Sequence, residues 1–62
     1  MKIQYNYGFK DFNGVLHIKN LAPLPTLEDA KRFAKIFYPE YTNMIFIKET
    51  IEENKISIEM VN

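Results

Sequence analysis

The chain has no cysteine and no tryptophan, only two glycines and one histidine, and its eight basic residues are balanced by eight acidic ones. Without cysteine, neither a disulfide framework nor a thiolate metal site can stabilise the fold. A net charge of zero disfavours nucleic-acid binding, because phosphate contacts normally require a basic excess. The longest uninterrupted apolar run, residues 44–47, is too short for a membrane span or a signal peptide.

The 62 residues are instead rich in aromatic side chains, with four tyrosines and five phenylalanines. This length predicts one domain near the lower limit for unaided folding, stabilised by the large area that aromatic residues bury. Without cysteine or a signal peptide, we expect a cytoplasmic protein. The composition, which leans towards isoleucine, lysine, asparagine and glutamate, also suits a small accessory protein of a phage or mobile element.

Alternation of apolar and polar residues predicts a first hairpin. From residue 2 to residue 10 the odd positions are mostly apolar, which is the period of a strand with one buried face. Asn13 and Gly14 favour a two-residue type I′ turn, which pairs Phe9 with Ile18. A four-residue loop over residues 11–14 keeps the same parity. Both predict a core face of Ile3, Tyr5, Tyr7, Phe9, Leu16 and Ile18.

A helix is predicted after the first hairpin. Thr26 is a suitable N-cap, and acidic residues 28 and 29 fall in the first turn, where the helix dipole favours them. The helix should end at residue 37 or 38, because Pro39 disfavours helical geometry in the residue before it. Apolar residues recur at helical spacing on one face: Leu27, Ala30, Ala34 and Phe37.

A second hairpin is predicted over residues 43–61. A turn at residues 52–55 pairs Ile51 with Ile56 and Ile47 with Met60 on one face. The third strand is then apolar on both faces, whereas a single helix covers only one face of a sheet. We therefore expect an uncovered face, and its candidate partner-binding residues are Phe12, Val15, His17, Met44, Phe46 and Val61.

These elements predict an α+β domain over residues 1–62, in which one amphipathic helix packs on a four-stranded mixed sheet in the order ββαββ. A crossover helix favours strand order 2-1-4-3, with the first and fourth strands parallel at the centre. This layout resembles the small β-grasp domains of the protein G and protein L type over nearly the whole chain. The resemblance implies a protein-binding role and matches no individual binding residue.

Catalytic and metal-binding residues are scarce. One histidine, one serine and no cysteine provide no nucleophile with its base, so we expect no enzymatic activity. His17 alone cannot close a metal site and is expected to be an ordinary surface residue. Gly8 and Gly14 belong to no phosphate-binding loop. We therefore expect neither a cofactor nor a metal.

Three functions follow from these expectations. The first is a small non-catalytic module, an accessory, inhibitor or regulator that docks on another protein. The second is a homodimer formed through the uncovered face or an edge strand. The third, disfavoured by the neutral charge, is weak nucleic-acid binding. It would use one of two basic groups: Lys10, Phe12, His17 and Lys19 on the sheet, or Lys31, Arg32 and Lys35 on the helix.

Overall fold

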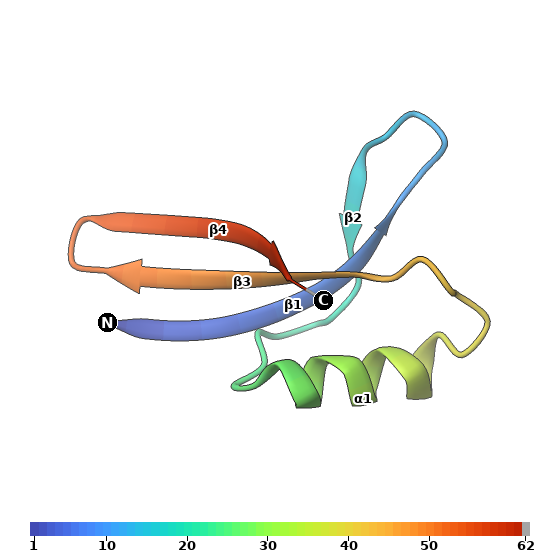
Figure 1. Cartoon of the computed structure of the whole chain (residues 1–62), viewed down its shortest axis with the longest axis horizontal. Helices are drawn as coiled ribbons and strands as arrows, with labels where there is room; N and C mark the ends of the chain where they lie inside the picture. The colour runs from blue at the N-terminus through green and yellow to red at the C-terminus, as the bar shows by residue number, and fades with distance from the viewer. Residues whose placement is uncertain (62) are drawn as a thin grey trace.

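One helix lies along one face of a four-stranded antiparallel sheet in the computed structural model, which describes residues 1–61 (Figure 1). The predicted α+β class and the order of the elements are confirmed. The elements are β1 (Lys2–Lys10), β2 (Leu16–Ile18), α1 (Leu27–Phe37), β3 (Ile45–Glu52) and β4 (Lys55–Val61).

The strand order is β2-β1-β3-β4, and every neighbouring pair is antiparallel. The predicted order 2-1-4-3 and the mixed sheet are therefore wrong, and the likeness to protein G type domains is limited to the order of elements. The reason lies in the side chains. β3 is apolar on both faces, which suits a central strand. β4 carries Lys55, Ser57 and Glu59 on one face, which suits an edge.

The helix forms where the sequence predicts it. The hydroxyl of Thr26 accepts a hydrogen bond of 3.1 Å from the backbone N–H of Asp29, which caps the first turn. At the other end, the N–H of Tyr38 donates to the carbonyl of Ala34, one residue before Pro39. Phe37 was predicted on the buried face but is 64 % exposed.

The core lies between α1 and β1, with Tyr5 and Tyr7 on the covered face as predicted, whereas Ile3, also predicted there, is 38 % exposed. Tyr7 is 3 % exposed, and it packs against Ala30 and Ala34, whose small side chains allow the helix to approach the sheet closely. Burial raises the pKa of the Tyr7 hydroxyl above its usual value, and the neighbouring Tyr38 raises it further. Partly buried residues complete the cluster: Tyr5, Leu24, Phe33, Tyr38, Met44 and Phe46.

The first hairpin turns through three residues instead of two. The N–H of Gly14 donates to the carbonyl of Asp11, and the N–H of Asp11 donates to the carbonyl of Val15, both at 3.0 Å. Gly14 has φ of 82°, and within residues 1–61 no other residue type has positive φ. A type I′ turn at Asn13 is therefore excluded; the loop is of the three-residue kind that ends in a left-handed glycine.

This loop shifts the pairing of β1 and β2 by one residue, so that Phe9 lies opposite His17. A shift of one residue moves every side chain of a strand to the other face of the sheet. Leu16 and Ile18 therefore lie away from the helix, and their predicted core positions are wrong. His17 takes the helix side, where the ring of Tyr41 stacks on Phe9 with centroids 4.4 Å apart.

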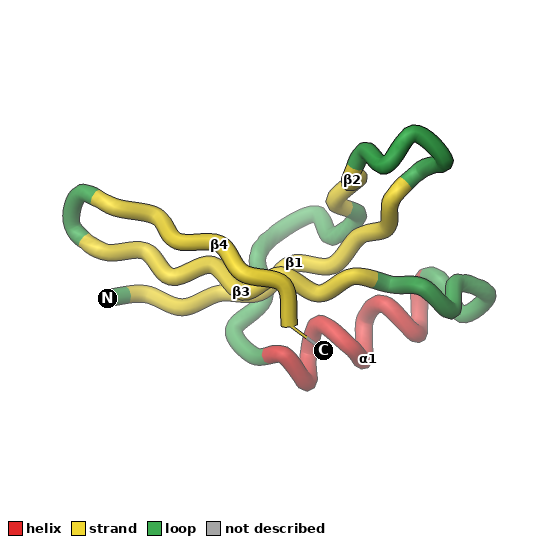
Figure 2. The backbone as a smooth tube through the Cα atoms, turned by 45° about the horizontal axis from the view of Figure 1, so that its top comes forward, coloured by secondary structure: helices red, strands yellow, loops and turns green. Residues whose placement is uncertain are grey.

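The connector between β2 and α1 covers much of the outer edge of β1 (Figure 2). Tyr5 and Leu24 exchange two backbone hydrogen bonds of 2.7 and 2.8 Å, and the carbonyl of Tyr7 accepts from the N–H of Lys19. The side-chain oxygen of Asn20 accepts from the N–H of Tyr7 at 2.9 Å. This side of the sheet is thus largely closed by the chain itself.

The opposite side of the sheet ends in the hairpin of β3 and β4. Its register matches the prediction at every pair, from Glu52 opposite Lys55 to Phe46 opposite Val61. The helix packs against β1 and β3. The turn of this hairpin and the start of β1 extend past the N-terminal end of α1 (Figure 1).

Candidate functional site

The residues predicted to form a partner-binding face do not lie together. Met44 and Phe46 pack against the core on the helix side, and Val61 lies opposite Phe46 on that same face. Their predicted place on the uncovered face is therefore wrong. Phe12 lies in the first hairpin loop and Val15 directly follows that loop, and their exposed fractions are 99 % and 54 %.

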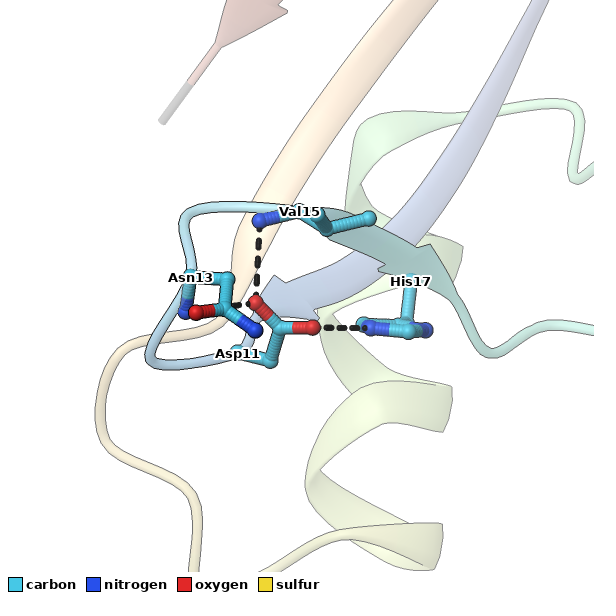
Figure 3. A network of polar contacts seen from close by, with 4 residues as sticks. All are labelled: Asp11, Asn13, Val15 and His17. Carbon is cyan, nitrogen blue, oxygen red and sulfur yellow. Dashed lines mark hydrogen bonds and ion pairs between the residues drawn. The ribbon is translucent and has the colours of Figure 1, made fainter.

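His17, the remaining predicted residue, is part of a polar network that shapes this loop (Figure 3). Its Nε2 atom lies 2.9 Å from Oδ2 of Asp11. The other carboxylate oxygen, Oδ1, accepts from the N–H groups of Asn13 and Val15 at 2.8 and 3.0 Å. Every member of the network binds another part of the same hairpin. We interpret it as the structural support of the hairpin.

Asp11 is the centre of this network. Its side-chain hydrogen bond with His17 lowers the pKa of the Asp11 carboxyl, and the N–H groups of Val15 and Asn13 lower it further. A carboxyl whose folded-state pKa is lowered stabilises the fold at pH values above its unfolded pKa, about 3.9 for aspartate. That stabilisation is lost as the pH falls through the lower, folded-state pKa.

Replacing Asp11 by asparagine should therefore lower Tm at pH 6 more than at pH 2. Comparison of thermal unfolding of the two proteins between these pH values measures the difference, and Glu53→Gln is a control with the same change in charge. Equal Tm differences at both pH values would show that the carboxylate does not support the loop.

Two of the basic residues proposed for nucleic-acid binding already contact other side chains of the same chain. The ammonium group of Lys19 lies 5.0 Å from the centre of the Phe9 ring, and Arg32 forms an ion pair of 2.7 Å with Asp29. Among residues 1–61, no three histidine or acidic side chains are placed to hold a metal ion. The same stretch contains no helix with the length and apolarity needed to cross a membrane.

A half-open hollow of about 470 Å³ lies between α1 and the connector. Its walls are largely apolar, with Leu24, Phe33 and Phe37 among them, and Lys19 is the charged side chain at its rim.

The sheet face turned away from the helix carries a row of apolar side chains on β3 and β4. Directly paired residues of an antiparallel sheet share a face. Tyr7 faces α1, so the even residues of β1 point away from the helix, and so do the residues paired with them on β3 and, through β3, on β4. We call the apolar members contributed by β3 and β4 the isoleucine face: Ile45, Ile47, Ile51, Ile56, Ile58 and Met60.

The outer half of the isoleucine face is open to solvent. Ile56, Ile58 and Met60 are 62 %, 67 % and 66 % exposed, whereas Ile47 is 6 % exposed. Beside this strip, the side-chain amide of Asn6 donates to Glu49, and its oxygen accepts from Asn20 at 2.8 Å. Asn6, Glu49 and Asn20 are therefore linked by hydrogen bonds, and the exposed apolar strip follows β4.

The backbone of β4 is open along the same strip. Tyr5 and Tyr7 direct their backbone groups to the connector, so the even residues of β1 direct theirs to β3. These even residues pair with the odd residues of β3, so β3 bonds to β4 through its even residues. Ile56, Ile58 and Met60 consequently direct their N–H and C=O groups to the free edge. Within residues 1–61, no strand pairs with this edge.

No family model matches the chain, and neither does any characterised protein or solved structure that was compared with it. The geometry of β4 is therefore the main indication of function. One part of that geometry was visible in the sequence, because the alternation of residues 55–61 had placed Ile56, Ile58 and Met60 on a common face. The sequence did not indicate which face of the sheet the helix covers.

Proposed function

We propose that this protein is a small non-catalytic binding module that takes an extended, alternately apolar strand of a polypeptide onto the free edge of β4. The observation that supports it is a coincidence at three residues. Ile56, Ile58 and Met60 expose both their side chains on the isoleucine face and their N–H and C=O groups at the edge. Strand addition uses both features, because main-chain bonds supply affinity and alternate side chains supply specificity.

The size of this surface suggests moderate affinity. A main-chain hydrogen bond contributes about 0.5–1.5 kcal/mol net. A fully buried isoleucine contributes about 1.5–3 kcal/mol. These gains must offset an association cost of roughly 4–15 kcal/mol. Because the cost offsets much of these gains, we expect dissociation constants in the micromolar range, where 1 μM corresponds to about −8 kcal/mol.

A soluble seven-residue peptide that alternates isoleucine and threonine tests this function directly. In an antiparallel pair, hydrogen-bonded residues lie opposite each other on one face, so the peptide isoleucines must use their own N–H groups to bind Ile56, Ile58 and Met60. NMR titration should shift the amide signals of these three residues. N-methylation of the peptide isoleucines should abolish binding, whereas N-methylation of its threonines, whose N–H groups point away, should leave binding intact.

Two protein variants complete the test. Ile58→Lys places a charge on the strip and should weaken peptide binding at least about tenfold, or about 1.4 kcal/mol. Phe12→Lys removes an apolar side chain that is even more exposed, on the hairpin loop, and should bind the peptide as the unmodified protein does. Equal binding by both methylated peptides, or by Ile58→Lys, would refute strand addition at β4.

A further inference from the structure

We propose that the strand occupying the β4 edge is β4 of a second copy, paired antiparallel about a two-fold axis at Ile58. This inference rests on the proposed function of the edge and names its partner. In this arrangement Ile58 lies opposite Ile58 of the second copy, and Ile56 lies opposite Met60. All three residues with outward N–H and C=O groups then find partners in both copies.

The geometry allows few alternatives. In a two-fold antiparallel pair, residues whose N–H and C=O groups point to the free edge must lie opposite each other. If most of β4 takes part in the pairing, the axis can pass only through Ser57, Ile58 or Glu59. An axis at Glu59 sets the two Glu59 carboxylates opposite each other, which is unfavourable.

An axis at Ser57 is the stronger competitor. It would place Lys55 opposite the oppositely charged Glu59 of the second copy. Met60, however, would lie opposite Asn54, which belongs to the turn and not to β4. Exposed ion pairs contribute little, less than the main-chain bonds and the buried methionine that this register loses. At the Ile58 axis, Lys55 still lies diagonal to Glu59 of the second copy, within reach of its long side chain.

The edge has few of the features that keep natural edge strands apart. β4 pairs with β3 without a bulge over Lys55–Val61, and between residues 56 and 61 it has neither proline nor lysine. The whole chain has zero net charge, so two copies do not repel each other through an excess of one sign. Residues 56–60 also read as apolar and polar in the same alternation from either end, which self-pairing requires.

The product is an eight-stranded sheet whose two isoleucine faces join across the axis. On the other face, the hydroxyl of Ser57 lies opposite the carboxylate of Glu59 of the second copy. One pair of edges buries less surface than the roughly 1,200–2,000 Å² of a standard stable interface. We therefore expect a dimer that forms and dissociates with concentration in the micromolar range.

Disulfide formation between introduced cysteines can test this register, because the chain has no cysteine of its own that would form other disulfides. At the Ile58 axis, residue 57 of one copy and residue 59 of the other form a non-hydrogen-bonded pair. The Cα atoms of such a pair lie about 4.5 Å apart, within the range that a disulfide spans. Oxidation of an equimolar mixture of Ser57→Cys and Glu59→Cys proteins, with different tags, should give mainly the mixed disulfide, several-fold above the two symmetric products.

The other outcomes overturn the proposal. A symmetric Ser57→Cys or Glu59→Cys product as the main species would place the axis at that residue and refute the register. Crosslinking no faster than that of a Phe12→Cys control, which carries its thiol on the hairpin loop, would refute the dimer. If the alternating peptide still bound β4 in that case, the proposed function would stand and only the second copy would be wrong.

Discussion

Replacing Phe46 by lysine is expected to unfold the domain at 25 °C. The Phe46 ring packs against the core cluster and lies opposite Tyr7 on the face that α1 covers. The change removes an aromatic ring from the core, at a cost of about 3–5 kcal/mol, and also places an ammonium group there. A domain of 62 residues has a total stability of about 3–9 kcal/mol, at about 0.05–0.15 kcal/mol per residue.

Ile58→Lys is the matched control, because it makes the same kind of change on the face that the helix leaves open. Ile58 is 67 % exposed, and a surface substitution of this kind usually changes stability by about 0.5 kcal/mol or less. Circular dichroism with thermal unfolding compares the two variants. A folded Phe46→Lys protein beside an unfolded Ile58→Lys protein would mean that the helix covers the isoleucine face instead.

Gly8→Ala is expected to give the second large loss of stability. Gly8 pairs with Ile18 of β2 on one side and with Ile45 of β3 on the other, so β1 has a neighbouring strand on both sides at this residue. A Cβ atom added there would lie inside the contact distance of the His17 carbonyl, and 3.0 Å from Cα of Ile18. The obstacle is backbone, so β2 must move. Overpacking of this kind costs about 1–3 kcal/mol, and Tm falls by about 4–8 °C for each kcal/mol.

Gly14→Ala separates steric crowding from backbone conformation. A Cβ atom on Gly14 would meet nothing within 4 Å, but its φ of 82° is a left-handed conformation that alanine adopts at a cost of about 1–2 kcal/mol. Gly14→Asn should cost less, because asparagine tolerates this region. Gly8→Asn, in contrast, should be at least as harmful as Gly8→Ala. If Gly8→Ala leaves Tm unchanged, the close approach of β1 and β2 is refuted.

The local elements were largely predictable because their signals are short-range. The alternation of residues 2–10 identifies a strand with Tyr5 and Tyr7 on its core side, and Thr26 and Pro39 bracket the helix. The register of β3 and β4 was predictable pair by pair, because one turn at residues 52–55 fixes all of it.

The faces were not predictable, because one residue in a loop decides them. Asn13 and Gly14 are the preferred residues of a two-residue turn, yet Asp11 holds the N–H groups of Asn13 and Val15 and so favours a three-residue loop. This difference of one residue inverts β2 and moves His17 to the helix side. The carboxylate two residues before Asn13 was the available signal.

The strand order depended on a signal that the sequence contained. A strand that is apolar on both faces belongs at the centre of a sheet, and β3 shows this pattern through Phe46 and Ile47. The preference for a parallel central pair favoured β4 in that place instead. With β3 at the centre, Phe46 packs under the helix, and β4 becomes the open edge on which the proposed function depends.

Hydrogen exchange of the β4 amides, followed residue by residue by NMR at low protein concentration, is the sharpest test of the open β4 edge. The amides of Ser57, Glu59 and Val61 bond to β3 and should exchange slowly, whereas those of Ile56, Ile58 and Met60 face the free edge and should exchange quickly. Raising the protein concentration should slow exchange at these three residues. The opposite alternation, or slow exchange at all six residues at every concentration, would contradict an open β4 edge.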